Sequence, residues 1–425
     1  MTAVPSRDAG PVPVRRTQLD NGLTVLSEHL PGVRSVSIGA WVRMASVHEP
    51  RALMGVSHLL EHMVFKGTRR RSAREIALSL EALGGSLDAY TSRENTSFQA
   101  RVLDEHVEQA ADVLGDLLFA PALREEDLQL ERQVVLEEIG MVEDTPDDLV
   151  FELHNELLWG EHPYGYSILG TRESVAALQA EDLRRVHARG YQPQHVVVAA
   201  AGNVTHEALL DVLRRTGWHE VPRGADAAAV APPAVAVAPR RRHVEREAAQ
   251  TQIVFGAPAV RHGDPRRYAM TLASAILGGG MSSRLFQRVR EELGLVYAVS
   301  SFHSFHTDCG THGVYLATSP DRSAEAVEAV QAILGDVATA GFTPEEVEAG
   351  KGQLKGQLTL SLESTSARMY RAAGTELFGE PYRPIDDILS QIDAIRADDL
   401  AAVAASFFAP EQQTVLSLGP AGATG

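Results

Sequence analysis

The amino-acid sequence predicts an α+β protein made of two similar domains, each a mainly antiparallel sheet packed by helices. Three observations lead to this class. Strand-like segments alternate with helical patterns along the first half of the chain, the same order returns in the second half, and a linker-like segment separates the two. The repeating half of about 200 residues is much longer than the repeats of solenoid proteins, so it indicates two domains rather than an array.

A segment without amphipathic periodicity divides the chain almost in half. Residues 221–242, VPRGADAAAVAPPAVAVAPRRR, are rich in alanine, proline and valine, which is typical of an extended linker. We therefore expect a first domain at 1–222, a linker at 223–242 and a second domain at 243–425. The basic run RRRH at 240–243 is short, and we expect it to be a solvated face.

Strand and helix signals follow one another through the first half. The helix at 72–85 opens with a capping box, Ser72 to Glu75, and ends on a glycine pair, whereas Pro146 interrupts a long helical pattern. In chain order we expect strands at 22–30 and 35–44, helices at 55–67 and 72–85, a hairpin at 86–94 and 95–103, helices at about 105–119 and 125–143, more helix, and a strand at 195–204.

The second half repeats this order with one chemical difference. The similar segments are 250–265 with 35–50, and 294–302 with 85–93. The helix at 268–280, YAMTLASAILGGG, takes the place of the helix at 55–67, yet it contains no histidine and no acid. Any chemistry carried by this helix therefore belongs to the first domain.

Composition limits the class of protein. A hydrophobic fraction of 44% over 425 residues is ample for globular cores. No uncharged apolar run of about 18 residues occurs, and the first twenty residues lack the apolar centre of a secretory signal, so we expect a cytoplasmic protein without a membrane partner. The single cysteine, Cys309, excludes internal disulfides and multi-thiolate metal sites, so a metal ion here needs histidine and carboxylate ligands.

The net charge of −17 argues against a nucleic-acid partner, because an acidic surface repels phosphate backbones. The same charge attracts cationic partners, among them basic peptides. The alternative is that the acidity only maintains solubility.

The helix at 55–67, GVSHLLEHMVFKG, carries three ionisable residues among apolar ones. His58 and His62 are one helical turn apart on the same face, with Glu61 beside them. Two imidazoles suit zinc and an adjacent carboxylate suits a general base; the order H-x-x-E-H is the reverse of the H-E-x-x-H metallopeptidase motif. In the alternative interpretation all three are ordinary surface residues, but burying them unpaired among apolar neighbours would be costly.

A third metal ligand is expected elsewhere, and the acidic segment 128–144 is the best candidate. Glu131 and Glu138 are seven residues apart, which places them two turns apart on one helix face. One of the two could bind the metal, while the other orients a ligand through a hydrogen bond without binding the metal itself. Glu137 must face another direction, and the alternative is that the acids form a solvated stripe.

Five motifs together resemble one known family, the pitrilysin-type zinc peptidases with the inverted motif. The motifs are SHLLEHMVFKGT, GGSLDAYTSRENT, ERQVVLEEIGMVED, HPYGYSILGT and REELGLVYAV. They are most similar to the short branch of the family, which includes the catalytic subunit of the mitochondrial processing peptidase and its bacterial relatives. The resemblance runs from about Leu19 to the end of the second copy and implies two duplicated α/β-roll domains.

The resemblance assigns roles to the residues already singled out. It implies that His58, His62 and Glu138 bind one zinc ion per subunit and that Glu61 is the catalytic base. It implies that Glu131 is an additional acid that supports the site without being a primary ligand. The implied activity is hydrolysis of peptide bonds in extended, unfolded peptides.

The resemblance also implies how substrate and subunits are arranged. Arg290 and Tyr297, in the second domain, match a pair that contacts substrate and stabilises the tetrahedral intermediate. Relatives of this length form dimers that enclose a chamber, so a homodimer is expected in which this pair acts across the interface. Asp88, Ala89 and Tyr90 match the edge strand to which relatives add the substrate peptide by β-augmentation. Many relatives carry Asn in place of Asp88, so the role of its side chain stays open.

Three other functions remain compatible with the sequence. Some family members have lost catalysis and serve as scaffold or partner subunits, although those usually lack part of the zinc motif. A second possibility is a module that binds peptides without cleaving them. The third is a presequence-processing peptidase that requires a separate partner chain.

Overall fold

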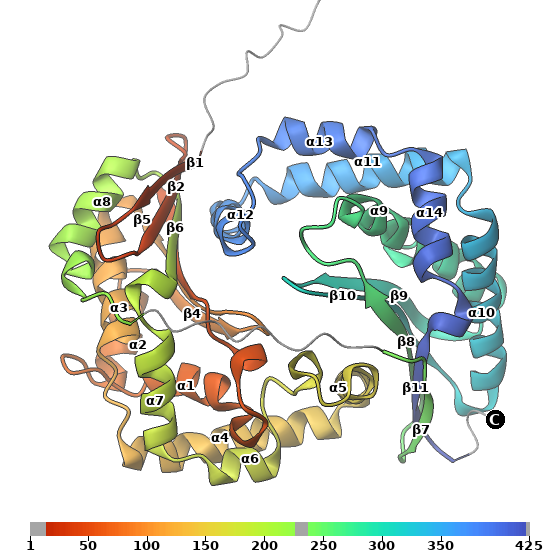
Figure 1. Cartoon of the computed structure of the whole chain (residues 1–425), viewed down its shortest axis with the longest axis horizontal. Coiled ribbons are helices and arrows are strands. Elements are labelled where there is room, and N and C mark those ends of the chain that lie inside the picture. Colours follow the sequence, from red (N-terminus) through yellow and green to blue (C-terminus); the bar gives the residue numbers. More distant parts are fainter. Residues whose placement is uncertain (1–13, 226–236, 422–425) are drawn as a thin grey trace, which may run out of the picture.

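The computed structural model describes residues 14–225 and 237–421. The middle of the expected linker, at 226–236, and the chain ends at 1–13 and 422–425 lie outside the described residues. Figure 1 shows two units side by side, the first half of the chain at the left and the second at the right. Each unit is a mixed sheet packed by helices, so the predicted α+β class is confirmed.

The two sheets have the same strand order apart from one additional edge strand in the first. That sheet runs β1-β2-β6-β3-β5-β4, and the second runs β7-β11-β8-β10-β9. Among the strands of the described residues, only β2–β6 and β7–β11 pair in parallel. The strands are β1 Val14–Gln18, β2 Thr24–His29, β3 Ser35–Val42, β4 Ser86–Thr91, β5 Thr96–Leu103 and β6 Val196–Gly202, then β7 Arg241–Glu245, β8 Thr251–Ala259, β9 Val296–Phe305, β10 Gly310–Thr318 and β11 Thr414–Gly419.

The helices also follow the repeated order. The first half contains α1 Val56–Val64, α2 Ala73–Glu81, α3 Val107–Phe119, α4 Glu125–Asp144, α5 Pro146–Trp159, α6 Arg172–Ala177, α7 Ala180–Gly190 and α8 His206–Arg215. The second contains α9 Arg267–Gly278, a π-helix at Phe286–Glu292, α10 Ser323–Ala340, α11 Pro344–Ser361, α12 Thr365–Leu377, α13 Ile385–Asp393 and α14 Ala397–Phe407. The capping box expected at Ser72 and Glu75 is present. Pro146 ends one helix pattern by starting the next, at the first position of α5.

Two edge strands differ from the sequence-based expectation. The residues of β1 alternate only weakly, so the sequence did not predict this strand, and in the described part of the chain it pairs with β2 alone. β7 begins at Arg241, inside the segment expected to be linker, and pairs in parallel with β11. Arg241 and Arg242 are exposed on that strand, as expected of a solvated basic run.

One helix from each half packs on the sheet of the other half. β6 is buried along its whole length, because the first half covers one face and α12 covers the other. α12 presents Met369, Ala372 and Ala373 to that face. In return, α5 packs on β8 and β11, with Val150 against Val254 in a shared core.

These crossing helices are held by specific contacts. The buried Glu28 carboxylate pairs with Arg368 of α12. His154 of α5 is within 3.1 Å of the Thr414 carbonyl oxygen. Gly256 leaves the space for this ring, since a Cβ there would come within 2.4 Å of His154.

Within the described residues, no helix is long and apolar enough to cross a membrane.

Candidate metal centre

The start of α1 is held by a buried carboxylate from the preceding loop. Glu49 accepts hydrogen bonds from the backbone amides of Gly55 and Ser57, both at 2.8 Å. Burial raises the pKa of Glu49 to about 7. Gly55 adopts a φ of 90°, and a Cβ there would approach the Leu169 carbonyl oxygen to 2.5 Å, so the helix start requires glycine.

α1 divides its side chains between a core and a cavity. Leu59, Leu60 and Met63 are almost completely buried in the core of the first half. His58, Glu61 and His62 lie on the other side of the helix and line a cavity of about 600 Å³. The apolar residues between the polar ones therefore hold the helix, while the polar ones face the open space.

The structure brings His58, His62 and Glu138 together, with one possible ligand atom from each within 4.8 Å of the others. His58 Nε2 is 3.7 Å from one Glu138 carboxylate oxygen, and His62 Nε2 is 3.6 Å from the other. Burial, with a smaller contribution from His62, lowers the pKa of His58 to about 4, which keeps that imidazole neutral.

This donor set fits zinc. Tetrahedral ligands at about 2.0–2.1 Å from the ion lie roughly 3.4 Å from one another, close to the observed spacing. Two neutral imidazole nitrogens and one carboxylate oxygen are also ligands that zinc accepts in catalytic sites, where a fourth position stays open. The separations exceed those of direct hydrogen bonds, so the three side chains surround a position rather than satisfy one another.

Glu131 contacts His62 at Nδ1, whereas Nε2 of the same ring faces Glu138. Its side chain is 6% exposed, with one carboxylate oxygen 3.2 Å from His62 Nδ1 and the other 2.7 Å from Lys66 Nζ. A carboxylate that accepts the Nδ1 proton turns Nε2 of the same ring toward the metal. Glu137 is exposed, as its helix position predicted.

Glu61 faces the same cavity and is held by the sheet. Its carboxylate accepts a hydrogen bond from the Thr91 hydroxyl, at the end of β4. Burial raises the pKa of Glu61 above its ordinary value, and the hydrogen bond from Thr91 partly offsets this effect. A carboxylate in this position, facing the same cavity as the three candidate ligands, suits a role in proton transfer.

The predicted substrate strand borders the cavity with two of its three residues. Ala89 and Tyr90 line it together with Thr91, whereas the Asp88 side chain does not. Asp88 instead lines a smaller cavity against α12, with Ser366 and Tyr370. Within the described residues β4 has β5 as its sole partner, so its other edge is available for pairing.

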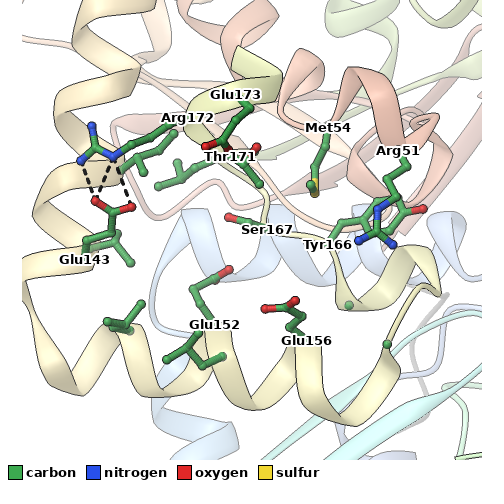
Figure 2. A pocket seen from close by; sticks show the side chains of 18 residues that line it. Arg51, Met54, Glu143, Glu152, Glu156, Tyr166, Ser167, Thr171, Arg172 and Glu173 are labelled. Carbon is green, nitrogen blue, oxygen red and sulfur yellow. Dashed lines mark hydrogen bonds and ion pairs between the residues drawn. The ribbon is translucent and has the colours of Figure 1, made fainter. Parts of the chain in front are cut away.

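A second cavity of about 350 Å³ adjoins the first and shares Val142, Glu152 and Leu169 with it. Figure 2 shows it between α4, α5 and the loop before α6. Its walls combine aliphatic side chains with the carboxylates of Glu152 and Glu156. Glu143 is neutralised there by Arg172, at 2.6 Å.

Arg290 and Tyr297 lie together but outside the metal-site cavity. The Arg290 guanidinium is 5.9 Å from the centre of the Tyr297 ring. Neither residue lines the cavity around His58, so the structure does not bring them to the site within one chain. Considered alone, Tyr297 would be expected in a strand core; it is instead 74% exposed, because β9 is an edge strand.

Sequence reasoning missed Glu49 and Thr91. Glu49 caps a helix from outside it, in a position that no capping pattern marks. Thr91 is part of the hairpin that was predicted, and only the packing of β4 beside α1 turns its hydroxyl toward Glu61.

Comparison with known proteins shows the family of the chain. Residues 24–172 match the family model for insulinase, peptidase family M16, and residues 177–354 match the model for the peptidase M16 inactive domain. An inverted zinc motif in a duplicated α+β frame defines the class: the protein is a metallopeptidase. The chain belongs to the insulinase family, peptidase family M16, which confirms the resemblance stated from the sequence.

Relatives and structures extend the match over nearly the whole chain. An uncharacterized zinc protease of Streptomyces coelicolor is 41% identical over 92% of this chain and 86% of its own length. The zinc protease YmxG of Bacillus subtilis is 38% identical over 96% and 99%. A protease from Helicobacter pylori has a TM-score of 0.90 at 22% identity, covering 96% of this chain and 99% of its own, which shows the shared fold.

Proposed function

We propose that the protein is a zinc-dependent endopeptidase acting on extended, unfolded peptides. The observation that carries this proposal is the arrangement of two imidazoles and a carboxylate around one position, with Glu61 in the same cavity. Relatives that match almost the full chain are named zinc proteases, which supports the same activity.

In this proposal, each side chain of the site has a separate role in hydrolysis. His58, His62 and Glu138 hold the ion, and Glu131 keeps the His62 ring in its ligating orientation. Zinc, when bound, supplies a Lewis acid that polarises the peptide carbonyl and makes water easier to deprotonate. Glu61 accepts the proton of the attacking water and then delivers it to the leaving amine.

The substrate lies along β4 in this proposal. A free strand edge binds an extended peptide through backbone hydrogen bonds, so recognition depends little on sequence. Asp148 and Glu152 line the cavity beside the metal ligands, which supports a preference for peptides with basic side chains. Phe151, between them, adds an apolar surface.

The active assembly is a homodimer enclosing a chamber, with Arg290 and Tyr297 reaching the metal centre of the partner subunit. The exposure of Tyr297, and its place outside the cavity of its own chain, support this arrangement. Donors aimed at the developing oxyanion typically contribute about 3 kcal/mol each.

The proposal is tested by incubating the purified protein with a mixed peptide library, with and without a chelator, and sequencing the products. We expect fragments that disappear with the chelator and return on adding zinc. Glu61→Gln should retain zinc, measured as metal content per chain, and lose about 100-fold or more in kcat. Glu137→Gln, on the exposed face of α4, is the matched control. Cleavage by Glu61→Gln at the parental rate would contradict the assignment of Glu61 as the base. No fragments from the parent protein would favour a scaffold subunit.

A further inference from the structure

The last residue of β4 connects the strand edge to the proposed base. Thr91 is 5% exposed, and its hydroxyl donates a hydrogen bond to the Glu61 carboxylate. A threonine side chain in a strand has few rotamers, so the direction of this hydroxyl is restricted. The terminal torsion of a glutamate, in contrast, is broad, and its carboxylate needs a partner to be fixed.

The backbone of Thr91 also faces the free edge of β4. The Ser92 amide donates to the Asn95 carbonyl at 2.9 Å, so this pair forms the hydrogen-bonded closure of the hairpin. In an antiparallel strand, residues whose backbone groups bond to the neighbouring strand alternate with residues whose backbone groups point away from it. Ser92 bonds to Asn95, so the backbone groups of Thr91 and of Ala89 point away from β5. Ala89 is therefore the nearest position before Thr91 at which a peptide can pair with the free edge of β4.

We propose that Thr91 is a positioning residue that fixes the Glu61 carboxylate at the end of the strand that pairs with substrate. This inference rests on the proposed peptidase function. A peptide paired at Ala89 and a base held by Thr91 share one rigid strand, so the strand sets the distance between the scissile carbonyl and the base. Thr91 touches neither the substrate nor the metal ligands in this role; it acts through Glu61.

Two substitutions separate the hydroxyl from the shape of the side chain. Thr91→Val keeps the branched shape and should lower kcat about 10- to 100-fold, as expected for losing one hydrogen bond to a charged group. KM should change little, because backbone pairing along β4 is kept. Thr91→Ser restores a hydroxyl and should recover kcat to within about threefold of the parent.

A double substitution tests whether Thr91 acts through Glu61. If it does, Thr91→Val should cause no further loss in a Glu61→Gln background, since the effects of coupled residues do not add. Thr96→Val is the matched control. Thr96 is the buried cross-strand neighbour of Thr91, but its hydroxyl donates to the Met44 carbonyl at 3.1 Å, so that variant should lose thermal stability while kcat stays within about twofold.

A structural readout makes the test independent of activity. In crystals of the metal-free protein, the Glu61 carboxylate should keep its place in Thr91→Ser and leave it in Thr91→Val. An unmoved carboxylate together with parental kcat in Thr91→Val overturns the inference while leaving the peptidase intact. Absence of chelator-sensitive cleavage by the parent protein overturns the proposed function itself, so the two failures are distinguishable.

Discussion

At the scale of single residues, the candidate metal centre is held in shape by side chains outside the proposed set of ligands and base. Glu49 fixes the start of α1 and Glu131 orients His62. Each is buried and polar, and each has a defined partner, as buried polar groups require. The short helix α1 thus carries three of the proposed site residues without a side-chain cap of its own.

Glu49 gives the protein a pH-dependent stability. Its pKa is about 7 in the folded protein and 4.5 ordinarily, so between these values the folded state holds a proton that the unfolded chain has lost. The free energy of unfolding should therefore fall as pH rises from about 4.5 to about 7, by up to about 3 kcal/mol, and change no further above that range.

Glu49→Gln removes this titration. Denaturant unfolding of the metal-free parent and variant at several pH values measures the difference, in which the contributions of all other groups cancel. We expect the parent to lose stability relative to the variant as pH rises toward 7. Parallel curves for the two proteins would contradict this account.

The residues of the centre were predicted to different degrees. His58, Glu61 and His62 share one helical turn, so spacing alone was informative. Glu138 lies on a separate helix, and its position next to them needed the resemblance or the structure. The contact between Thr91 and Glu61 depends on how β4 packs beside α1, which local sequence does not encode.

At the scale of elements, α5 and α12 occupy corresponding places in the two halves. Each follows a long helix, α4 or α11, and each packs on the sheet of the other half. Local patterns predicted most strands and helices, because periodicity and caps are local signals. They could not show which sheet a helix covers. The weak edge strands β1 and β7 were missed for a similar reason, since pairing with β2 and β11 defines them.

The ion pair between Glu28 and Arg368 should contribute strongly to holding α12 on the first sheet. Arg368→Met leaves the Glu28 carboxylate, 2% exposed, without its cationic partner, and should lower the free energy of unfolding by about 3 kcal/mol. Arg396→Met is the matched control: its partner Asp399 is partly exposed, and the change should stay within about 0.5 kcal/mol.

Denaturant unfolding with fluorescence detection measures both variants. The double variant Glu28→Leu with Arg368→Met should recover much of the loss, because two apolar groups replace a buried pair without leaving a charge. Equal effects of Arg368→Met and Arg396→Met would contradict a specific role for the buried pair.

At the scale of the whole molecule, the proposed dimer predicts complementation between two inactive variants. His58→Ala removes a metal ligand, and Tyr297→Phe removes a donor. If Tyr297 serves the partner's centre, a mixed dimer has one intact site. Random mixing should then restore roughly a quarter of parental activity, measured as peptide cleavage per chain after subunit exchange. No activity above the separate variants would argue that each subunit uses its own Tyr297.

The exchange of α5 and α12 also has a consequence for biosynthesis. α5 leaves the ribosome with the first half, but the strand that covers Val150 includes Leu416 and Leu418, near the end of the chain. The second face of β6 is likewise buried only when α12, from the second half, packs on it. The apolar faces of α5 and β6 that the other half covers therefore stay exposed until residues of the second half have been made, and such transiently exposed faces favour aggregation.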